Sequence, residues 1–90
     1  MKVQLSPKLI KKLKKHDVRI RNNFKKAIEL FSQDPHNLEL DNHELEKEWE
    51  GFRSIDVTAD LRAIYQEDRE EEEPVAYFVA LGTHKELYGE

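Results

Sequence analysis

Residues 53–66 read RSIDVTADLRAIYQ, and this stretch decides the fold of the second half of the chain. Side chains on either side of the central TAD alternate between two faces, so that Arg53, Ile55 and Val57 are expected on one face and the residues between them on the other. A repeat of two residues interrupted by a tight turn predicts a β-hairpin. This part of the chain therefore belongs to a sheet.

The segments that follow the hairpin differ sharply in composition. Residues 67–74, EDREEEEP, are so highly charged that they predict a loop. Residues 75–82, VAYFVALG, form a nearly continuous apolar run, which is typical of a strand covered on both faces. A short polar tail, containing His84 and Tyr88, then closes the chain.

The first 37 residues predict a short strand followed by two helices, because their apolar residues recur at helical spacing. KVQL at 2–5 predicts a strand, and Ser6-Pro7 is a helix cap followed by a proline at the first helical position. The helix is expected to end near His16, and Asp17 then caps a second helix whose apolar residues recur every three or four positions. SQDPHN at 32–37 ends this helical hairpin, and an irregular stretch is expected from there to about Glu50.

These elements predict an α+β fold in which an N-terminal strand and a helical hairpin pack on a mostly antiparallel sheet of three to four strands. The 90 residues allow one domain, 1–90. The chain has no cysteine, no apolar signal segment and no run long enough to span a bilayer, which predicts a cytoplasmic protein with no membrane association.

Charge divides the chain into a basic and an acidic part. Residues 1–30 contain ten Lys or Arg and two acids, whereas residues 31–90 contain five Lys or Arg and seventeen acids, which gives the net charge of −4. The first helix is amphipathic, and its outward face carries lysines that include Lys11, Lys12 and Lys15. Such asymmetry can mark a nucleic-acid surface or only two solvated faces of opposite sign.

Several kinds of chemistry find no support in the sequence. The three glycines form no phosphate-binding loop, the four histidines lack the spacing of a metal site, and no serine stands in the context of a hydrolase nucleophile. We therefore expect no metal and no cofactor. The charged residues of the hairpin and its flanks remain as candidates: His43, Arg53, Asp56, Asp60, Arg62 and His84.

This set supplies what metal-free cleavage of RNA requires. A base must take the proton of the 2′-hydroxyl, an acid must protonate the leaving 5′-oxygen, and a cation must hold the phosphate. Histidine suits the proton transfers near neutral pH, and arginine suits the phosphate. The alternative is that Arg53 and Arg62 only pair with acids across the sheet.

Three ordered motifs show a resemblance to a known superfamily. NHELEKEWEGFRSIDVTADLRAIYQ at 42–66, followed by YFVALGTHKELYG at 77–89, resembles the RelE/ParE toxins, and most of all the YafQ-like and RelE/StbE-like toxins of type II toxin–antitoxin pairs. The resemblance implies a microbial RNase-type fold, cleavage of mRNA on the ribosome without a metal, and a cognate antitoxin as partner. The free protein would be a monomer or a toxin–antitoxin hetero-oligomer.

The resemblance also implies roles for individual residues. The family's catalytic positions fall on His43, on Asp60 and on His84, which becomes the general acid, while its phosphate-contacting arginine falls on Arg62 and the glycine-flanked arginine on Arg53. The chain departs from the YafQ-like pattern at two positions, where Asp56 replaces a histidine and Leu61 replaces a tryptophan. Asp56 could serve as the base if burial raises its pKa.

The sequence leaves two alternatives for the role of each of two aromatic residues, and two alternatives for the function of the chain. Tyr88 could stack on a nucleobase or only anchor the tail, and Trp49 could be a base platform or a residue at the core edge. The leading hypothesis is an mRNA endonuclease toxin. The alternative is a non-catalytic protein of the same fold, either a ParE-like gyrase inhibitor or a homologue that only binds an antitoxin.

Overall fold

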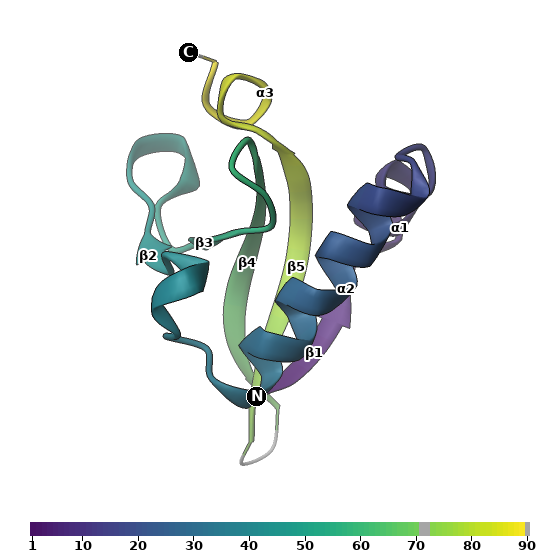
Figure 1. Ribbon diagram of the computed structural model, residues 1–90. Coiled ribbons are helices and arrows are strands. Elements are labelled where there is room, and N and C mark those ends of the chain that lie inside the picture. Colours follow the sequence, from purple (N-terminus) through teal and green to yellow (C-terminus); the bar gives the residue numbers. More distant parts are fainter. Residues whose placement is uncertain (71–72, 90) are drawn as a thin grey trace.

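The computed structural model describes residues 1–70 and 73–89, which form a single mixed sheet with helices packed on it (Figure 1). The strand order is β1-β5-β4-β3-β2. The elements in chain order are β1 (Lys2–Leu5), α1 (Pro7–Lys14), α2 (Val18–Gln33), η1 (Leu38–Leu40), β2 (His43–Glu44), η2 (Lys47–Trp49), β3 (Arg53–Asp56), β4 (Leu61–Glu70), β5 (Glu73–Thr83) and α3 (His84–Tyr88), where η denotes a 3₁₀ helix.

The predicted α+β fold is confirmed, but the expected number of strands was wrong. The described residues form five strands, because β1 joins the sheet beside β5 and the two residues of β2 extend it beside β3. β1 runs parallel to β5, with Lys2 opposite Val75 and Leu5 opposite Phe78. All other neighbours are antiparallel.

The helices begin where the sequence predicts. The Ser6 hydroxyl accepts a hydrogen bond from the Leu9 amide at 3.0 Å, and the Asp17 carboxylate accepts one from the Ile20 amide at 3.0 Å. Each cap satisfies a backbone donor that the first helical turn leaves without a partner. No helix in the described part of the chain is both long and apolar enough to cross a bilayer.

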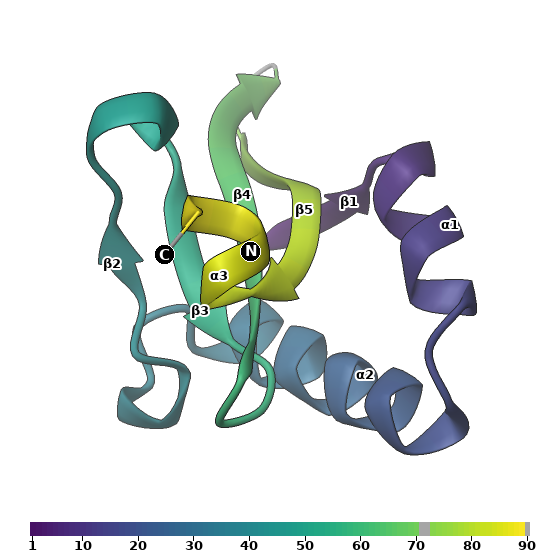
Figure 2. The same cartoon turned by 90° about the horizontal axis from the view of Figure 1, so that it is seen from above.

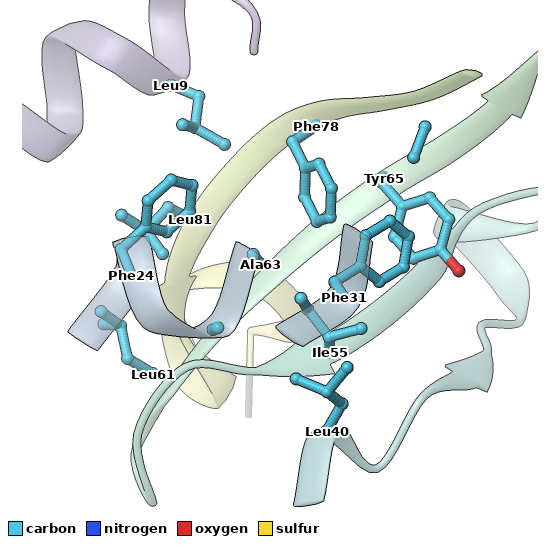
Figure 3. Close-up of a cluster of buried hydrophobic side chains, with 12 residues drawn as sticks. Leu9, Phe24, Phe31, Leu40, Ile55, Leu61, Ala63, Tyr65, Phe78 and Leu81 are labelled. Atoms are coloured by element: carbon cyan, nitrogen blue, oxygen red, sulfur yellow. The ribbon is translucent and has the colours of Figure 1, made fainter. Parts of the chain in front are cut away.

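The hydrophobic core lies between α1, α2 and one face of the sheet (Figure 3). Phe31 of α2 is fully buried and contacts two aromatic rings of the sheet, Tyr65 at 4.9 Å and Phe78 at 5.3 Å between ring centroids. Ile55 and Ala63 are also fully buried on this face. We call it the core face, and the opposite face of the same sheet is called the site face.

The acidic segment is mostly strand and not the loop that its composition predicts. β4 continues to Glu70 and β5 begins at Glu73, while residues 71 and 72 of the predicted loop lie outside the described residues. Pairing with β5 satisfies the backbone groups that this part of β4 directs toward β5, and its charged side chains, such as Glu67 and Asp68, remain exposed. High charge therefore excluded burial of the side chains but not pairing of the backbone.

The stretch between α2 and β3, expected to be irregular, contains short ordered elements. Asn42 holds it to the sheet, because its side-chain amide donates to the Pro35 carbonyl and to the Tyr65 hydroxyl, both at 2.8 Å. The predicted tail after β5 is also ordered, as helix α3. β5 itself is covered on both faces near its start, since its adjacent residues Val75 and Ala76 are both buried.

Candidate active site

Successive side chains of a strand point to opposite faces of the sheet, so the neighbours of buried core residues lie on the site face. Several of these neighbours are charged. Ile55 and Ala63 face each other across β3 and β4 within the core, so the next cross-strand pair, Asp56 and Arg62, lies on the site face. The Arg62 Nε atom is 3.6 Å from the Asp56 Oδ1 atom. The pair is an ion pair at a separation beyond that of a hydrogen bond.

The environment of Asp56 disfavours the charged form of its carboxyl. Its Oδ1 atom is buried and has no hydrogen-bond partner within the part of the chain that the structure describes. Burial raises the pKa of the Asp56 carboxyl above its ordinary value, Arg62 and His43 oppose this effect, and the nearby Asp41 reinforces it. A carboxyl of raised pKa holds a proton more readily, as a general base near neutral pH requires.

His84 is placed by helix α3, of which it is the first residue. Thr83 caps this helix in a reciprocal pair: its hydroxyl accepts from the Glu86 amide at 3.2 Å, and the Glu86 carboxylate accepts from the Thr83 amide at 2.9 Å. Such a capping box fixes the backbone at the helix start. The position of the imidazole therefore depends on Thr83 and Glu86.

Two further contacts hold α3 against the rest of the molecule. The Trp49 indole N–H donates to the Leu87 carbonyl at 2.9 Å, and the Lys12 ammonium lies 3.5 Å from the Glu86 carboxylate. The hydrogen bond from the Thr83 amide, and then the charge of Lys12, lower the pKa of the Glu86 carboxyl. The view in Figure 2 looks down on α3, which lies over the sheet between the 43–53 segment and α1.

Gly82, just before α3, allows this close packing. A Cβ atom on Gly82 would lie 3.1 Å from the Lys12 ammonium nitrogen and 3.3 Å from Glu86 Cβ. Both distances are tighter than ordinary van der Waals contact. The glycine of the Gly82-Thr83-His84 motif thus makes room for α3 and for the lysine of α1.

Three of the predicted residues line one cavity. It has a volume of about 520 Å³ and is lined by Ala59, Asp60, Arg62, Thr83, His84 and Lys85. The cross-strand pairs Leu61–Thr83 and Arg62–Gly82 bring the β3–β4 turn beside the end of β5. A carboxylate from the β3–β4 turn, a guanidinium from the start of β4 and an imidazole from the end of the chain therefore converge here.

A second cavity lies on the other side of His84. It has a volume of about 280 Å³, and its walls include Lys47, Trp49, His84 and Tyr88. The Tyr88 ring packs edge-on against the imidazole of His84 with centroids 4.6 Å apart. The Tyr88 hydroxyl is buried, with no hydrogen-bond partner among residues 1–70 and 73–89.

His43 is on the site face, but it is not among the residues that line the cavity of Arg62 and His84. It is exposed on β2 opposite Ser54, and its Nδ1 atom lies 2.7 Å from the Asp41 carbonyl oxygen. β3 separates its strand from the strand of Arg62, and two inter-strand spacings amount to about 10 Å. His43 acts on this site through its charge, which lowers the pKa of Asp56.

Arg53 is held elsewhere. Its Nε atom donates to the Asn42 side-chain carbonyl at 2.9 Å, its Nη1 atom is 3.2 Å from Glu44, and it lines a cavity that contains neither His84 nor Arg62. Of the three lysines predicted on the first helix, Lys12 reaches α3, while Lys11 of α1 and Lys15, the C-cap residue of α1, are exposed.

The sequence analysis missed the residues that position α3. The letters THKE at 83–86 are a capping box, which predicts a helix start, but the motif was considered only for its histidine. The sequence left open whether Trp49 is a residue at the core edge or a base platform, and the structure adds that its indole donates a hydrogen bond to α3. Among the described residues, no group of three or more His, Asp or Glu is arranged to hold a metal ion.

The fold is that of small toxins of known structure. The structure superposes on a YafQ structure from Escherichia coli with a TM-score of 0.75 at 24% identity, covering 97% of both chains. A YoeB/ParE toxin from Agrobacterium tumefaciens gives a TM-score of 0.74 at 17% identity, covering 93% of this chain and 99% of that one. At these identities the likeness shows the fold.

A family model places the chain more narrowly. The model described as the bacterial toxin of type II toxin–antitoxin system, YafQ, matches residues 3–89. The chain therefore belongs to the YafQ family of type II toxins. An E. coli DinJ–YafQ toxin–antitoxin complex matches with a TM-score of 0.73 at 25% identity, covering 97% of this chain and 96% of that one. No curated protein sequence matches the chain.

Proposed function

We propose that this YafQ-family toxin is an endoribonuclease that cleaves mRNA on the ribosome without a metal and is neutralised in the cytoplasm by a cognate antitoxin. The observation that carries the proposal is the cavity in which Asp60, Arg62 and His84 meet. His84, more than twenty residues away from Asp60 and Arg62 in the sequence, joins them in one site with the acid, the carboxylate and the cation that transesterification of RNA needs.

The reaction follows from these groups. The 2′-oxygen attacks the neighbouring phosphorus as a carboxylate takes its proton, and a 2′,3′-cyclic phosphate forms. The bond from phosphorus to the 5′-oxygen breaks, and protonated His84 gives its proton to that oxygen. The Arg62 guanidinium holds the phosphate oxygens while negative charge accumulates on them.

Asp56 is the first candidate for the general base. Its raised pKa suits proton abstraction, and Arg62 joins it to the phosphate-binding position. Asp60, at the turn beside the same cavity, is the second candidate. His43 is the third candidate for the base, because β3 lies between its strand, β2, and the strand of Arg62, β4.

RNA binding uses surfaces on both sides of His84. Lys12, with Lys11 on the same helix and Lys15 at its C-cap, places positive charge beside α3 and gives the acidic chain a local site for phosphates. The cavity between Trp49 and Tyr88 offers aromatic side chains to a nucleobase next to the scissile phosphate. The phosphate role predicted for Arg53 is not part of this arrangement.

The antitoxin is proposed from the similarity to YafQ. A YafQ structure that covers 97% of this chain was solved in complex with the antitoxin DinJ. A protein of the same family and nearly the same extent is expected to have a partner of that kind.

Primer extension on a reporter mRNA, incubated with the toxin in the presence and absence of translating ribosomes, tests the proposed activity. We expect cuts that appear only when ribosomes are present. Absence of any cut, whether or not translation stops, would favour the alternative function, a non-catalytic binding protein. The observation that favours this alternative is that Asp56 replaces the histidine of the family pattern.

A further inference from the structure

The connection between η1 and β2 places a further polar residue beside His43. Asp41 follows η1 and has left-handed backbone angles, φ 47° and ψ 46°, and its amide donates to the Leu38 carbonyl at 3.3 Å. Aspartate adopts this conformation more readily than most residues other than glycine. With these backbone angles, the Asp41 carbonyl faces the imidazole of His43, two residues further on.

The contact between these two residues decides which ring nitrogen carries the proton. The His43 Nδ1 atom lies 2.7 Å from the Asp41 carbonyl oxygen. A carbonyl oxygen only accepts hydrogen bonds, so Nδ1 is the donor at this distance and carries the hydrogen. In the neutral ring Nε2 then has the lone pair, and it is the nitrogen that takes up or releases a proton.

The carboxylate of Asp41 adds a charge to this contact. Its Oδ2 atom lies 3.9 Å from the His43 Nδ1 atom, and both side chains are exposed, 46% for His43 and 69% for Asp41. Water screens an ion pair of this exposure, so its contribution is small. The carbonyl therefore orients the ring, and the carboxylate adds a weaker attraction when the ring is protonated.

The backbone that carries this pair is anchored to the core. Asn42 lies between Asp41 and His43 in the sequence. Its side chain donates to the Tyr65 hydroxyl at 2.8 Å and accepts from the Arg53 Nε atom at 2.9 Å, and Tyr65 is buried. The position of the Asp41 carbonyl is thus fixed by hydrogen bonds of its neighbour, as is required of a group that orients another.

The pair lies within electrostatic reach of the site face. β2 is the edge strand beside β3 (Figure 2), and His43 lies opposite Ser54, two residues before Asp56. Burial is the largest cause that raises the pKa of the Asp56 carboxyl, and Arg62 opposes it; Asp41 raises this pKa further and His43 lowers it. Both members of the pair therefore act by charge on the first candidate for the base.

We propose that Asp41 is a positioning residue of the active site, whose carbonyl holds His43 as the Nδ1–H tautomer and leaves Nε2 as the nitrogen that exchanges protons on the site face. The inference rests on the proposed function for the use of His43 in cleavage. The tautomer itself is a property of the free toxin and can be measured without RNA. Asp41 was not among the site residues predicted from the sequence.

Long-range ¹H–¹⁵N correlation spectra of the ¹⁵N-labelled toxin, recorded at a pH where the imidazoles are neutral, test the tautomer. We expect the proton on Nδ1 of His43, whereas the exposed His36 should show the Nε2–H form that an exposed histidine ordinarily favours. Asp41→Val should move His43 toward the Nε2–H form, because a β-branched residue is strained in the left-handed conformation. Asp41→Asn adopts this conformation readily and keeps the carbonyl, so it should retain the Nδ1–H form. The amide spectrum of each variant reports whether the core is folded.

Single-turnover cleavage of ribosome-bound mRNA tests the link between the tautomer and the reaction. Asp41→Val should lower the rate about tenfold, and Asp41→Asn should lower it less than about threefold. The matched control Glu39→Gln makes the same charge change as Asp41→Asn on exposed η1 and should cleave at the wild-type rate.

Two results would overturn the inference alone. One is the Nε2–H form of His43 in the wild-type toxin. The other is an Asp41→Val variant that is folded and keeps either the wild-type tautomer or the wild-type rate. Absence of cleavage by the wild-type toxin would instead overturn the proposed function, and with it the catalytic part of the inference, while the spectra would still decide the tautomer.

Discussion

The two faces of the sheet are built from the same strands but differ in burial and polarity. On the core face, Phe31, Ile55 and Ala63 are fully buried and apolar. On the site face, the strand neighbours of Ile55 and Ala63, which are Asp56 and Arg62, are partly exposed and charged. Alternation along a strand is what allows a protein of 90 residues to hold both environments within one layer of backbone.

The difference extends to polar atoms. The buried Ser54 Oγ, Asp56 Oδ1 and Tyr88 hydroxyl have no hydrogen-bond partner within the described residues. Leaving a polar group buried and unpaired costs about 1–3 kcal/mol. The core face therefore supplies stability, whereas the site face carries buried polar groups that lower it.

The largest effect is expected from Phe31→Ala on the core face. Removal of a fully buried phenyl ring that contacts Tyr65 and Phe78 should lower the free energy of unfolding by about 3–5 kcal/mol. Urea denaturation followed by circular dichroism measures this loss. The exposed Val18→Ala on α2 is the control and should change stability by less than about 0.5 kcal/mol. Equal losses would contradict the assignment of the core.

Arg62→Ala tests the site face. Loss of the guanidinium should reduce the rate of mRNA cleavage about 100-fold, because a phosphate in the cavity loses its cation. Single-turnover cleavage on ribosome-bound mRNA measures the rate. Arg69→Ala, an exposed arginine further along β4, is the matched control and should cleave at the wild-type rate. Similar rates for the two variants would remove Arg62 from the site.

Asp56→Asn separates charge from shape on the same face. Burial raises the pKa of Asp56, so the folded protein holds this proton more tightly than the unfolded chain. Stability should then fall as the pH rises from the unfolded pKa, 3.8, through the folded one, and this fall should be absent in the variant. Cleavage should drop about tenfold or more near neutral pH if the carboxylate is the base. A variant with wild-type cleavage would transfer the role to Asp60.

The smallest effect is expected from Trp49→Phe, which keeps an aromatic ring but removes the donor to Leu87. One lost hydrogen bond should cost about 1 kcal/mol of stability and lower the cleavage rate a few-fold by loosening α3. The pH profile of cleavage should keep its shape, since Trp49 positions His84 and transfers no proton. A changed profile would show that Trp49 acts directly on the reacting groups.

The core face was predictable from the sequence and the site face only in part. Helical spacing at Leu9 and Phe24, the caps at Ser6 and Asp17, and the alternation at Ile55 are local signals, and the structure confirms the elements they predict. The strand at 67–70 was missed because its pairing with β5 depends on a partner and not on its own charge.

The site depended on long-range geometry. The cavity shared by Asp60, Arg62 and His84 exists because Leu61 pairs with Thr83, a register that spacing alone does not specify. Arg53 and Arg62 looked equivalent in the sequence, but they lie at opposite ends of the β3–β4 pairing and on opposite faces, so their partners differ. The hydrogen bond from Trp49 to Leu87 spans 38 residues and left no local signal.

The most direct test of the account is His84→Ala, measured for cleavage of ribosome-bound mRNA and for unfolding in the same preparation. We predict that cleavage falls by at least about 100-fold, as expected for loss of a general acid. We also predict that the free energy of unfolding changes by less than about 1 kcal/mol, because the imidazole lies outside the core cluster. Retained cleavage would contradict the placement of catalysis on the site face, and lost cleavage with lost folding would contradict the separation of the two faces.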